Sequence, residues 1–208
     1  MRFSIIGLFL FAACCCNRPY RPEAGDLLFQ VTSASEFTDA ITEVTSGRQG
    51  IPYSHVAIVV RTREGMRVLE AVPGEGVRLV TFDRFLDNSA RRGGRPLLMA
   101  ARLRERHLSD GACRRALALV GRPYDAAFMP GDQALYCSEL VQVCFLDGEG
   151  NPLFASRPMN FRDSTGQIAP YWLEHYARLG LPVPQDVPGT NPGALSRDPQ
   201  LRVVYSYF

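Results

Sequence analysis

Short apolar runs bounded by glycine and proline recur along the chain and predict β-strands. Three of these runs are closely spaced, and the turn sequences Glu64-Gly65 and Pro73-Gly74-Glu75-Gly76 separate them. Because such short connections join neighbouring strands, we expect an antiparallel meander. The predicted strands cover residues 25–30, 55–61, 66–72, 77–82, 96–103 and 201–208.

Other segments have apolar residues at the spacing of a helix face. Ser35 is the expected N-cap of the first of these helices, Ser109 is expected to begin the third, and Pro170 is expected to break the last one. The proline-rich stretch 182–199 is predicted to be irregular. Helices grouped around an antiparallel sheet predict one α+β domain. The predicted helices cover residues 35–46, 83–88, 109–120, 136–146 and 165–179.

The N-terminus has the features of an export signal. Met1-Arg2 is followed by an apolar run over 5–13 and by three consecutive cysteines from Cys14. The run is too short to span a bilayer. It resembles a bacterial lipoprotein signal, in which cleavage before Cys14 leaves that thiol to carry lipid. We therefore expect a signal peptide over 1–13, a tether over 14–24 and one domain over 25–208. A plain secretory signal and a buried apolar terminus are the alternatives.

The charge pattern gives little support to nucleic-acid binding. The formal net charge is +2, and we interpret the short arginine clusters as parts of the solvent-exposed surface. All 23 basic residues counted as Lys or Arg are arginine. The absence of lysine removes a lysine base or Schiff base from the possible chemistry.

Three cysteines remain after the signal region: Cys113, Cys137 and Cys144. Cys113 and Cys144 lie among apolar neighbours at helical spacing, which predicts buried thiols. Cys137 and Cys144 are two helical turns apart, about 10 Å, which is too far for a disulfide. The sequence has no Cys-x-x-Cys or His-x-x-x-His spacing, so we expect no structural metal and no cofactor.

A cysteine, a histidine and a glutamate carry the candidate chemistry. Cys137 begins a predicted helix, where the free N–H groups and the positive dipole end favour the thiolate. His55 begins an apolar strand, and Glu70 lies between apolar residues on the next strand, where a buried carboxylate needs a partner. We expect Glu70 to bind one ring nitrogen of His55 while the other faces Cys137. Alternatively, Cys137 is a core thiol and Glu70 pairs with Arg61 or Arg67.

Several short motifs occur in an order that resembles the permuted papain-like amidases, also called YiiX/YebB-like. This family is a circularly permuted branch of the NlpC superfamily of cysteine hydrolases, in which the histidine strand precedes the cysteine helix. The resemblance covers roughly residues 24–146. The motifs are Gly25-Asp26-Leu27-Leu28-Phe29, Ser54-His55-Val56-Ala57-Ile58-Val59, Leu69-Glu70-Ala71, Gly76-Val77, Gly121-Arg122-Pro123-Tyr124-Asp125 and Tyr136-Cys137-Ser138-Glu139-Leu140-Val141.

The resemblance implies a circularly permuted papain-like (NlpC-like) α+β fold, in which an antiparallel sheet packs against the cysteine-bearing helix. It also implies Cys137 as nucleophile, His55 as general base and Glu70 as the group that orients the imidazole. The substrate would be an amide or ester, cleaved through an acyl-enzyme. The Cys137 N–H and a second donor, either Tyr124 or Tyr53, would hold the oxyanion. Ser138 is a weaker candidate nucleophile, because its hydroxyl ionises only at high pH.

From these observations we expect an exported cysteine amidase or peptidase, anchored in the bacterial cell envelope by a lipid on Cys14 and facing the periplasm. Its expected substrate is an envelope amide, either a peptidoglycan peptide or an N-acyl amino compound. A lipid acyltransferase or lipid hydrolase and a non-catalytic envelope-binding lipoprotein are the alternatives. Substrate selection is expected in segments 31–53, 83–95 and 147–170. Residues expected either in an apolar pocket or in the core are Phe154, Met159, Phe161, Tyr171 and Trp172.

Overall fold

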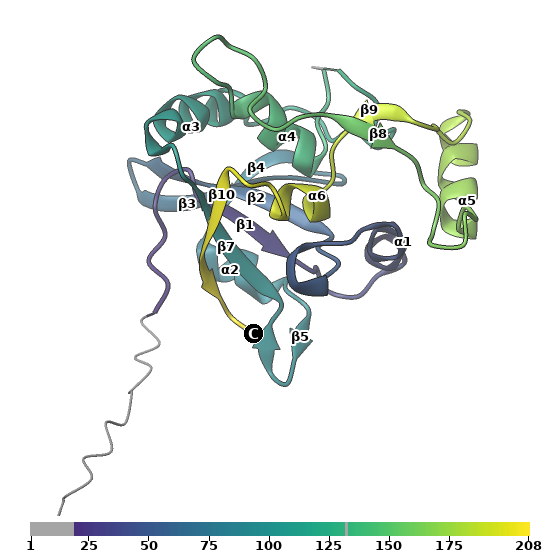
Figure 1. Ribbon diagram of the computed structural model, residues 1–208, viewed down its shortest axis with the longest axis horizontal. Helices are drawn as coiled ribbons and strands as arrows, with labels where there is room; N and C mark the ends of the chain where they lie inside the picture. Colours follow the sequence, from purple (N-terminus) through teal and green to yellow (C-terminus); the bar gives the residue numbers. More distant parts are fainter. Residues whose placement is uncertain (1–18, 132) are drawn as a thin grey trace, which may run out of the picture.

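The computed structural model describes residues 19–131 and 133–208, and its centre is a six-stranded antiparallel sheet (Figure 1). The strand order is β10-β7-β1-β2-β3-β4. Two further pairs, β5 with β6 and β8 with β9, lie outside this sheet. The strands are β1 Leu27–Gln30, β2 His55–Thr62, β3 Gly65–Val72, β4 Gly76–Val80, β5 Arg91–Arg92, β6 Arg95–Pro96, β7 Leu98–Leu103, β8 Arg157–Met159, β9 Val187–Gly189 and β10 Leu201–Ser206.

The predicted meander is confirmed as β2-β3-β4. Ile58 on β2 pairs with Leu69 on β3. Glu70 on β3 pairs with Arg78 on β4. Short turns fix this register, because a tight connection determines which residues stand opposite each other.

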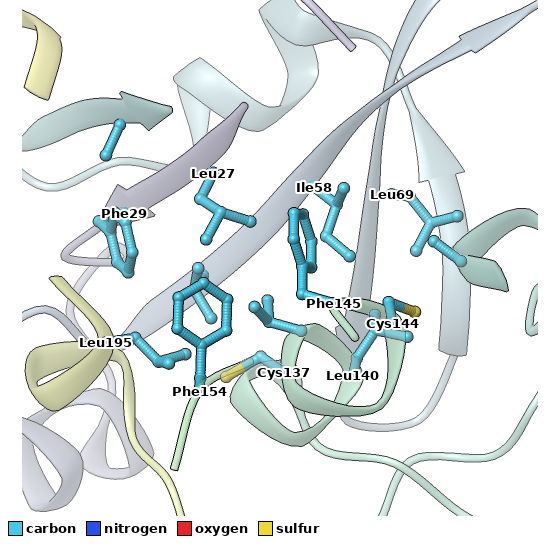
Figure 2. Close-up of a cluster of buried hydrophobic side chains, with 14 of the residues drawn as sticks. Leu27, Phe29, Ile58, Leu69, Cys137, Leu140, Cys144, Phe145, Phe154 and Leu195 are labelled. Atoms are coloured by element: carbon cyan, nitrogen blue, oxygen red, sulfur yellow. The ribbon is translucent and has the colours of Figure 1, made fainter. Parts of the chain in front are cut away.

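Alternate residues of the strands point to the two faces of the sheet. Val56, Ile58 and Val60 of β2 belong to the core cluster that also contains residues of α3 and α4. Ala57 and Val59 belong to a cluster on the other face, together with Phe85 of α2. Figure 2 shows side chains of the sheet meeting those of α4 in the main core. The helices are α1 Glu36–Val44, α2 Phe82–Asp87, α3 Ser109–Ala118, α4 Cys137–Cys144, α5 Pro170–Leu179 and α6 Pro192–Ser196, with short 3₁₀ turns at Arg48–Gly50 and Arg106–Leu108.

One helix start differs from the sequence-based prediction. The predicted helix over 165–179 begins only at Pro170, which fits the first turn because its missing N–H is not needed there. The preceding residues form a turn, held by the Asp163 carboxylate, which accepts the N–H groups of Thr165 and Gln167. Ser109 is the first helical residue of α3, as predicted. Ser35 caps α1, also as predicted, and accepts the Thr38 N–H.

Two predicted segments are divided more finely in the structure. The strand expected over 96–103 separates into β6, which pairs with β5 across a Gly93-Gly94 turn, and β7 in the main sheet. The stretch 182–199, expected to be irregular, contains β9 and α6. Asn191 caps α6 and Pro192 occupies its first turn, so the proline begins this helix instead of preventing it.

The predicted signal peptide over 1–13 and the predicted lipidation at Cys14 lie outside the described residues. Of the predicted tether, the last residues pack on the domain. The Tyr20 hydroxyl donates to Asp26, and Glu23 pairs with Arg102 and Arg106. The folded domain therefore starts before Gly25. Within residues 19–131 and 133–208, no helix has the length and apolar character needed to cross a membrane.

Candidate active site

Cys137 is the first residue of α4, and Tyr136 is its N-cap. Helix α4 packs against β2 and β3, so its N-terminus meets the end of the sheet where β2 begins. The N–H groups of a first helical turn have no acceptor within the helix. Cys137 therefore combines a nucleophilic side chain with free donors at the same point of the backbone. Its side chain is buried but lines a cleft.

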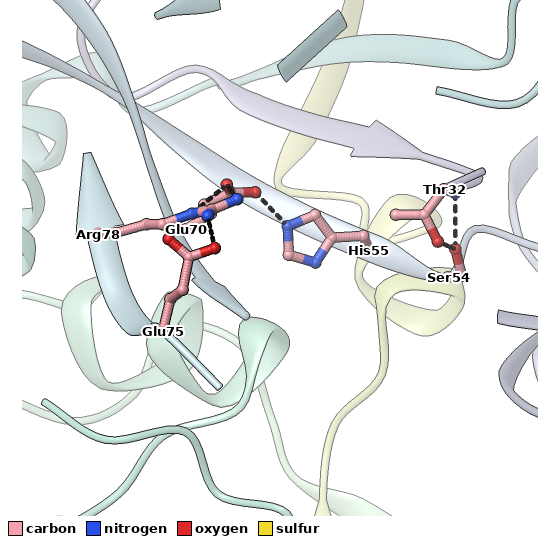
Figure 3. Close-up of polar contacts among 6 residues, drawn as sticks. All are labelled: Thr32, Ser54, His55, Glu70, Glu75 and Arg78. Atoms are coloured by element: carbon pink, nitrogen blue, oxygen red, sulfur yellow. Dashed lines mark hydrogen bonds and ion pairs between the residues drawn. The ribbon is translucent and has the colours of Figure 1, made fainter. Parts of the chain in front are cut away.

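His55 and Glu70 meet across β2 and β3, as the sequence predicted (Figure 3). His55 Nε2 lies 2.8 Å from a Glu70 carboxylate oxygen, and both side chains are buried. The other Glu70 oxygen accepts hydrogen bonds from Arg78 Nε at 2.9 Å and Nη2 at 2.8 Å. Arg78 also pairs with Glu75. The four side chains form a continuous polar chain from the sheet into the cleft.

Arg78 is the arginine that binds Glu70, in place of Arg61 or Arg67, which the sequence suggested. Arg61 pairs with Met66 at the far end of the β2-β3 hairpin, and the Arg67 side chain reaches Glu64. Arg78 stands directly opposite Glu70 on β4. The short Pro73–Gly76 turn determines this register, so the turn length was the signal from which Arg78 could have been found.

Opposite charges in this cluster stabilise each other, which shifts the pKa values of His55 and Glu70. Burial alone would lower the pKa of His55, but hydrogen bonds to Cys137 and Glu70, and their negative charges, raise it to about 10. Burial opposes ionisation of Glu70, yet His55 and Arg78 hold the pKa of its carboxyl below the ordinary value. Since Nε2 is bound to Glu70, Nδ1 is the nitrogen available to the thiol. At neutral pH the arrangement favours a protonated His55 imidazole beside an ionised Glu70 carboxylate.

The site opens into a cleft of about 430 Å³, within the range of about 300–1,000 Å³ typical of small-molecule sites. Its lining comes from segments far apart in the chain: α1, the start of β2, the β3-β4 turn, the loop before α4, β8, α5 and the loop before α6. His55 and Cys137 both line it. Met159, Phe161 and Trp172 line it as well, whereas Phe154 is in the core and fully buried. Tyr171 packs against Trp172 in the aromatic cluster behind the cleft.

Of the two tyrosines considered as oxyanion donors, the structure brings Tyr124 to the cleft. Burial and the nearby charge of Cys137 raise its pKa well above the usual value, so its hydroxyl stays a donor. Gly76 positions this loop: with φ of +69°, it approaches the Arg122 carbonyl so closely that a Cβ would lie 2.2 Å from the oxygen. Tyr53 lies elsewhere. It is fully buried, and its hydroxyl contacts Met99 Sδ at 3.5 Å.

The residues beside Cys137 on α4 have structural partners. The Ser138 hydroxyl donates to the Thr190 carbonyl, which ties α4 to the segment before α6. Glu139 accepts the Gly131 N–H, and burial raises its pKa to about 7. Cys113 and Cys144 are buried and free, as predicted. Asp26 is fully buried and binds Arg102 through both oxygens, at 2.5 and 2.8 Å, which is a structural role.

A family model described as permuted papain-like amidase enzyme, YaeF/YiiX, C92 family, matches residues 21–205. The chain belongs to this amidase family. Membership makes it a cysteine hydrolase of the amidase class, with the histidine strand before the cysteine helix. No curated protein sequence matches the chain.

A solved relative has the same fold as this permuted papain-like amidase. The crystal structure of metalloprotein yiiX from Escherichia coli O157:H7 matches with a TM-score of 0.73. The match covers 90% of this chain and 98% of that chain, at 22% sequence identity. At this identity the likeness establishes the fold alone. The α+β, circularly permuted papain-like architecture expected from the motif order is therefore confirmed.

Proposed function

We propose that this amidase works through a triad of Cys137, His55 and Glu70, and hydrolyses an amide through a thioester intermediate. The observation that supports this most is the position of His55, which hydrogen bonds to Glu70 at 2.8 Å and lines the same cleft as Cys137. Nucleophile, base and orienting group thus come from three separate elements, α4, β2 and β3. This is the arrangement expected of an activated cysteine.

In the acylation step, the Cys137 thiolate attacks the substrate carbonyl and a C–S bond forms. The oxyanion that results is stabilised by the backbone N–H of Cys137 and by the Tyr124 hydroxyl. The C–N bond then breaks as the protonated His55 Nδ1 gives its proton to the leaving amine. The products of this step are a free amine and a thioester on Cys137.

In the deacylation step, neutral His55 accepts a proton from a water molecule that attacks the thioester. The C–S bond breaks, a carboxylic acid leaves, and the thiolate and imidazolium are restored. Glu70 keeps the imidazole oriented in both steps and balances its positive charge. Arg78 acts through Glu70: by binding the second oxygen at 2.8 and 2.9 Å, it holds the carboxylate toward His55.

The yiiX structure is titled as that of a metalloprotein. In the described part of this chain, no group of three or more His, Cys, Asp or Glu side chains could hold a metal ion. The residues at the cleft therefore do not fit a metal site formed by side chains. The steps proposed above use only groups of the protein and water.

We further propose that the enzyme is exported, carries a lipid on Cys14 and acts on an amide of the cell envelope. The support is the sequence of the first 16 residues: a basic start, a short apolar run and the cysteines from Cys14. The substrate classes consistent with this location are peptidoglycan peptides and N-acyl amino compounds. Neither nucleic acid nor a further protein partner is required.

Selective alkylation tests the triad. At pH 7 we expect iodoacetamide to modify Cys137 at least 100-fold faster than Cys113 or Cys144, measured by mass spectrometry of the intact protein and its peptides. Burial raises the pKa of Cys113 to about 11 and that of Cys144 to about 12, so both are protonated internal controls. In His55→Ala, the rate at Cys137 should fall at least tenfold at this pH.

Equal reactivity of the three cysteines, or a rate at Cys137 that does not respond to His55→Ala, would contradict the triad. That result would favour a non-catalytic envelope-binding protein. A second control is His107→Ala, because His107 is an exposed histidine near Glu105, away from the cleft. This variant should alkylate like the wild type.

Lipidation can be tested on its own. In bacteria expressing the full chain, we expect Cys14 to incorporate labelled palmitate and the protein to enter the detergent phase of Triton X-114. Cys14→Ser should lose both properties, and Cys15→Ser, which changes the neighbouring thiol, should keep them. Labelling that persists in Cys14→Ser would disprove the anchor without affecting the proposal for the triad.

A further inference from the structure

A chain of three hydroxyls lies in the cleft beside His55. Thr32 follows β1, Ser54 immediately precedes His55, and Thr38 belongs to α1. Thr32 Oγ1 lies 3.0 Å from Ser54 Oγ and 2.7 Å from Thr38 Oγ1, and all three residues line the cleft. Figure 3 shows the first two next to His55. The hydroxyl chain therefore joins α1, a wall of the cleft, to the strand that begins with His55.

The direction of each hydrogen bond in the hydroxyl chain is determined, because a hydroxyl has one proton. Thr38 Oγ1 donates to the Ser33 carbonyl at 3.1 Å, since a carbonyl can only accept. Thr38 must therefore accept from Thr32 in the contact between their hydroxyls. The Thr32 proton is then used, so Thr32 must accept from Ser54. All the protons point from Ser54 toward α1.

Ser54 consequently offers the cleft an acceptor and no donor. Its Oγ gives its proton to Thr32 Oγ1 and accepts the Thr32 N–H at 2.9 Å, which leaves one lone pair without a partner among the described residues. Thr38 has no lone pair left, because it also accepts from Ser35 Oγ at 3.0 Å. A hydroxyl that donates into a chain of hydrogen bonds becomes a better acceptor, so Ser54 Oγ is suited to bind an N–H group.

The backbone places this acceptor near the atom that His55 must protonate. By the alternation of β2, Ser54 falls on the side of Val56, which belongs to the core cluster shared with α4. Ser54, His55 and Cys137 line the same cleft. In the proposed reaction, the lone pair of the leaving nitrogen points toward His55 to receive a proton, so the N–H bond of that nitrogen points away from the imidazole. The N–H then needs a separate acceptor, and Ser54 provides one.

We propose that Ser54 Oγ accepts the N–H of the scissile amide and makes the site selective for amides that carry a hydrogen on nitrogen. This inference rests on the proposed function, because it takes Cys137 as the nucleophile and His55 as the proton donor. When the C–N bond breaks, the nitrogen keeps its own hydrogen, bound to Ser54, and gains one from His55, so a secondary amide releases a primary amine. An ester oxygen and the nitrogen of a tertiary amide have no hydrogen and cannot form this contact. Thr32 and Thr38 are positioning residues that act through Ser54.

Two coumarin substrates with the same acyl group test this contact. One is the butyryl amide of aminomethylcoumarin, whose leaving nitrogen carries a hydrogen, and the other is the butyryl ester of methylumbelliferone. Fluorescence gives kcat/KM, and mass spectrometry follows the acylation of Cys137. In Ser54→Ala we expect kcat/KM for the amide to fall by about tenfold or more, whereas kcat/KM for the ester should change by less than about twofold. The ratio of the two values within one variant does not depend on the fraction of folded enzyme.

Thr38→Val tests the hydroxyl chain behind Ser54. Valine has the shape of threonine without the hydroxyl, so the Thr32 proton loses its acceptor and the orientation of the Ser54 hydroxyl is no longer fixed. We expect the amide-to-ester ratio to fall by about threefold, and Thr38→Ser, which keeps the hydroxyl, to retain the wild-type ratio. Thr42→Val is the matched control on the same helix. The Thr42 hydroxyl donates to the Asp39 carbonyl and Thr42 does not line the cleft, so the ratio should stay at the wild-type value.

The pH profile of amide hydrolysis separates a contact with the substrate from an effect that Ser54 exerts through His55. If Ser54 binds the substrate N–H, the alkaline limb of kcat/KM should stay at its wild-type pH in Ser54→Ala. A limb that moves would show that Ser54 acts by holding His55, and would overturn the proposed contact.

The failures of the two proposals are distinguishable. An unchanged amide-to-ester ratio in Ser54→Ala disproves the N–H contact and leaves the triad unaffected. The same conclusion follows if the wild type cleaves the ester but not the amide, and this result needs no variant to fold. If neither substrate acylates Cys137, the triad itself fails, and the N–H contact fails with it.

Discussion

Replacing Cys137 with alanine is expected to reduce amide hydrolysis by on the order of 10⁴-fold or more, to the level of the uncatalysed reaction. The thiolate forms the bond to the substrate carbon in the proposed reaction, and no neighbouring group can take its place. Ser138, the adjacent hydroxyl, is 1% exposed and already donates to Thr190. The measurement is kcat/KM on fluorogenic aminocoumarin amides with apolar acyl groups.

The same substitution should leave the fold nearly unchanged. Cys137 contributes one small side chain to the core beside Leu140 and Phe154 (Figure 2), so we expect a loss of about 1 kcal/mol in the free energy of unfolding. Cys113→Ala is the matched control, because it removes a buried thiol that donates to the Val59 carbonyl and does not line the cleft. Full activity in Cys137→Ala, or equal losses in both variants, would contradict the proposed nucleophile.

Glu70→Gln is expected to lower kcat/KM by about 10²- to 10⁴-fold. The amide is nearly the same size as the carboxylate but is neutral, so it no longer stabilises the imidazolium or fixes the His55 tautomer. It also leaves the two Arg78 hydrogen bonds without a charged acceptor. Because Arg78 keeps Glu75 as a partner, the arginine is not left isolated. The loss should appear mainly in kcat.

The pH profile separates this effect from a merely structural one. In the proposed mechanism His55 gives a proton to the leaving amine, so activity should require its protonated form and fall as the pH rises through its pKa. In the wild type, hydrogen bonds to Cys137 and Glu70 raise that pKa to about 10 against the opposing effect of burial. Removing the negative charge of Glu70 lowers it. The alkaline limb of kcat/KM should therefore move to lower pH in Glu70→Gln.

Arg78→Lys provides the accompanying control. A lysine keeps the positive charge near Glu70 but cannot reproduce the two-pronged contact of the guanidinium. We expect an intermediate loss of activity and a smaller shift of the alkaline limb than in Glu70→Gln. An unchanged limb in Glu70→Gln, together with normal activity, would mean that Glu70 is only a partner of Arg78 in the sheet.

Together these residues explain why the site lies where the β2 strand begins. His55 is the first residue of a central strand: its backbone pairs with Gln30 of β1, and its ring lines the cleft. Glu70 on β3 and Arg78 on the edge strand β4 extend the polar chain. The sheet and the start of a helix thus carry the three residues of the proposed triad, and helices, loops and β8 form the cleft around them.

Sequence patterns that span only a few residues were sufficient to predict much of the structure of this protein. Ser35 was identified as a helix cap because capping depends on the next three residues, and the meander followed from two short turns. The position of Cys137 at a helix start, and the nearness of His55 to Glu70 on adjacent strands, were predictable for the same reason. The motif order was sufficient to predict the family and the permuted fold.

Other features depended on contacts between distant segments. Tyr53 and Tyr124 were equivalent in the sequence, but core packing places Tyr53 beneath Met99, while the loop held at Gly76 brings Tyr124 to the cleft. Likewise, Phe128 faces the cleft because His175 and Tyr176, some 50 residues later, bind its loop. The sequence alone determined the chemical groups and their local backbone. The tertiary structure decided which of them share one cleft, because that depends on how separate elements pack.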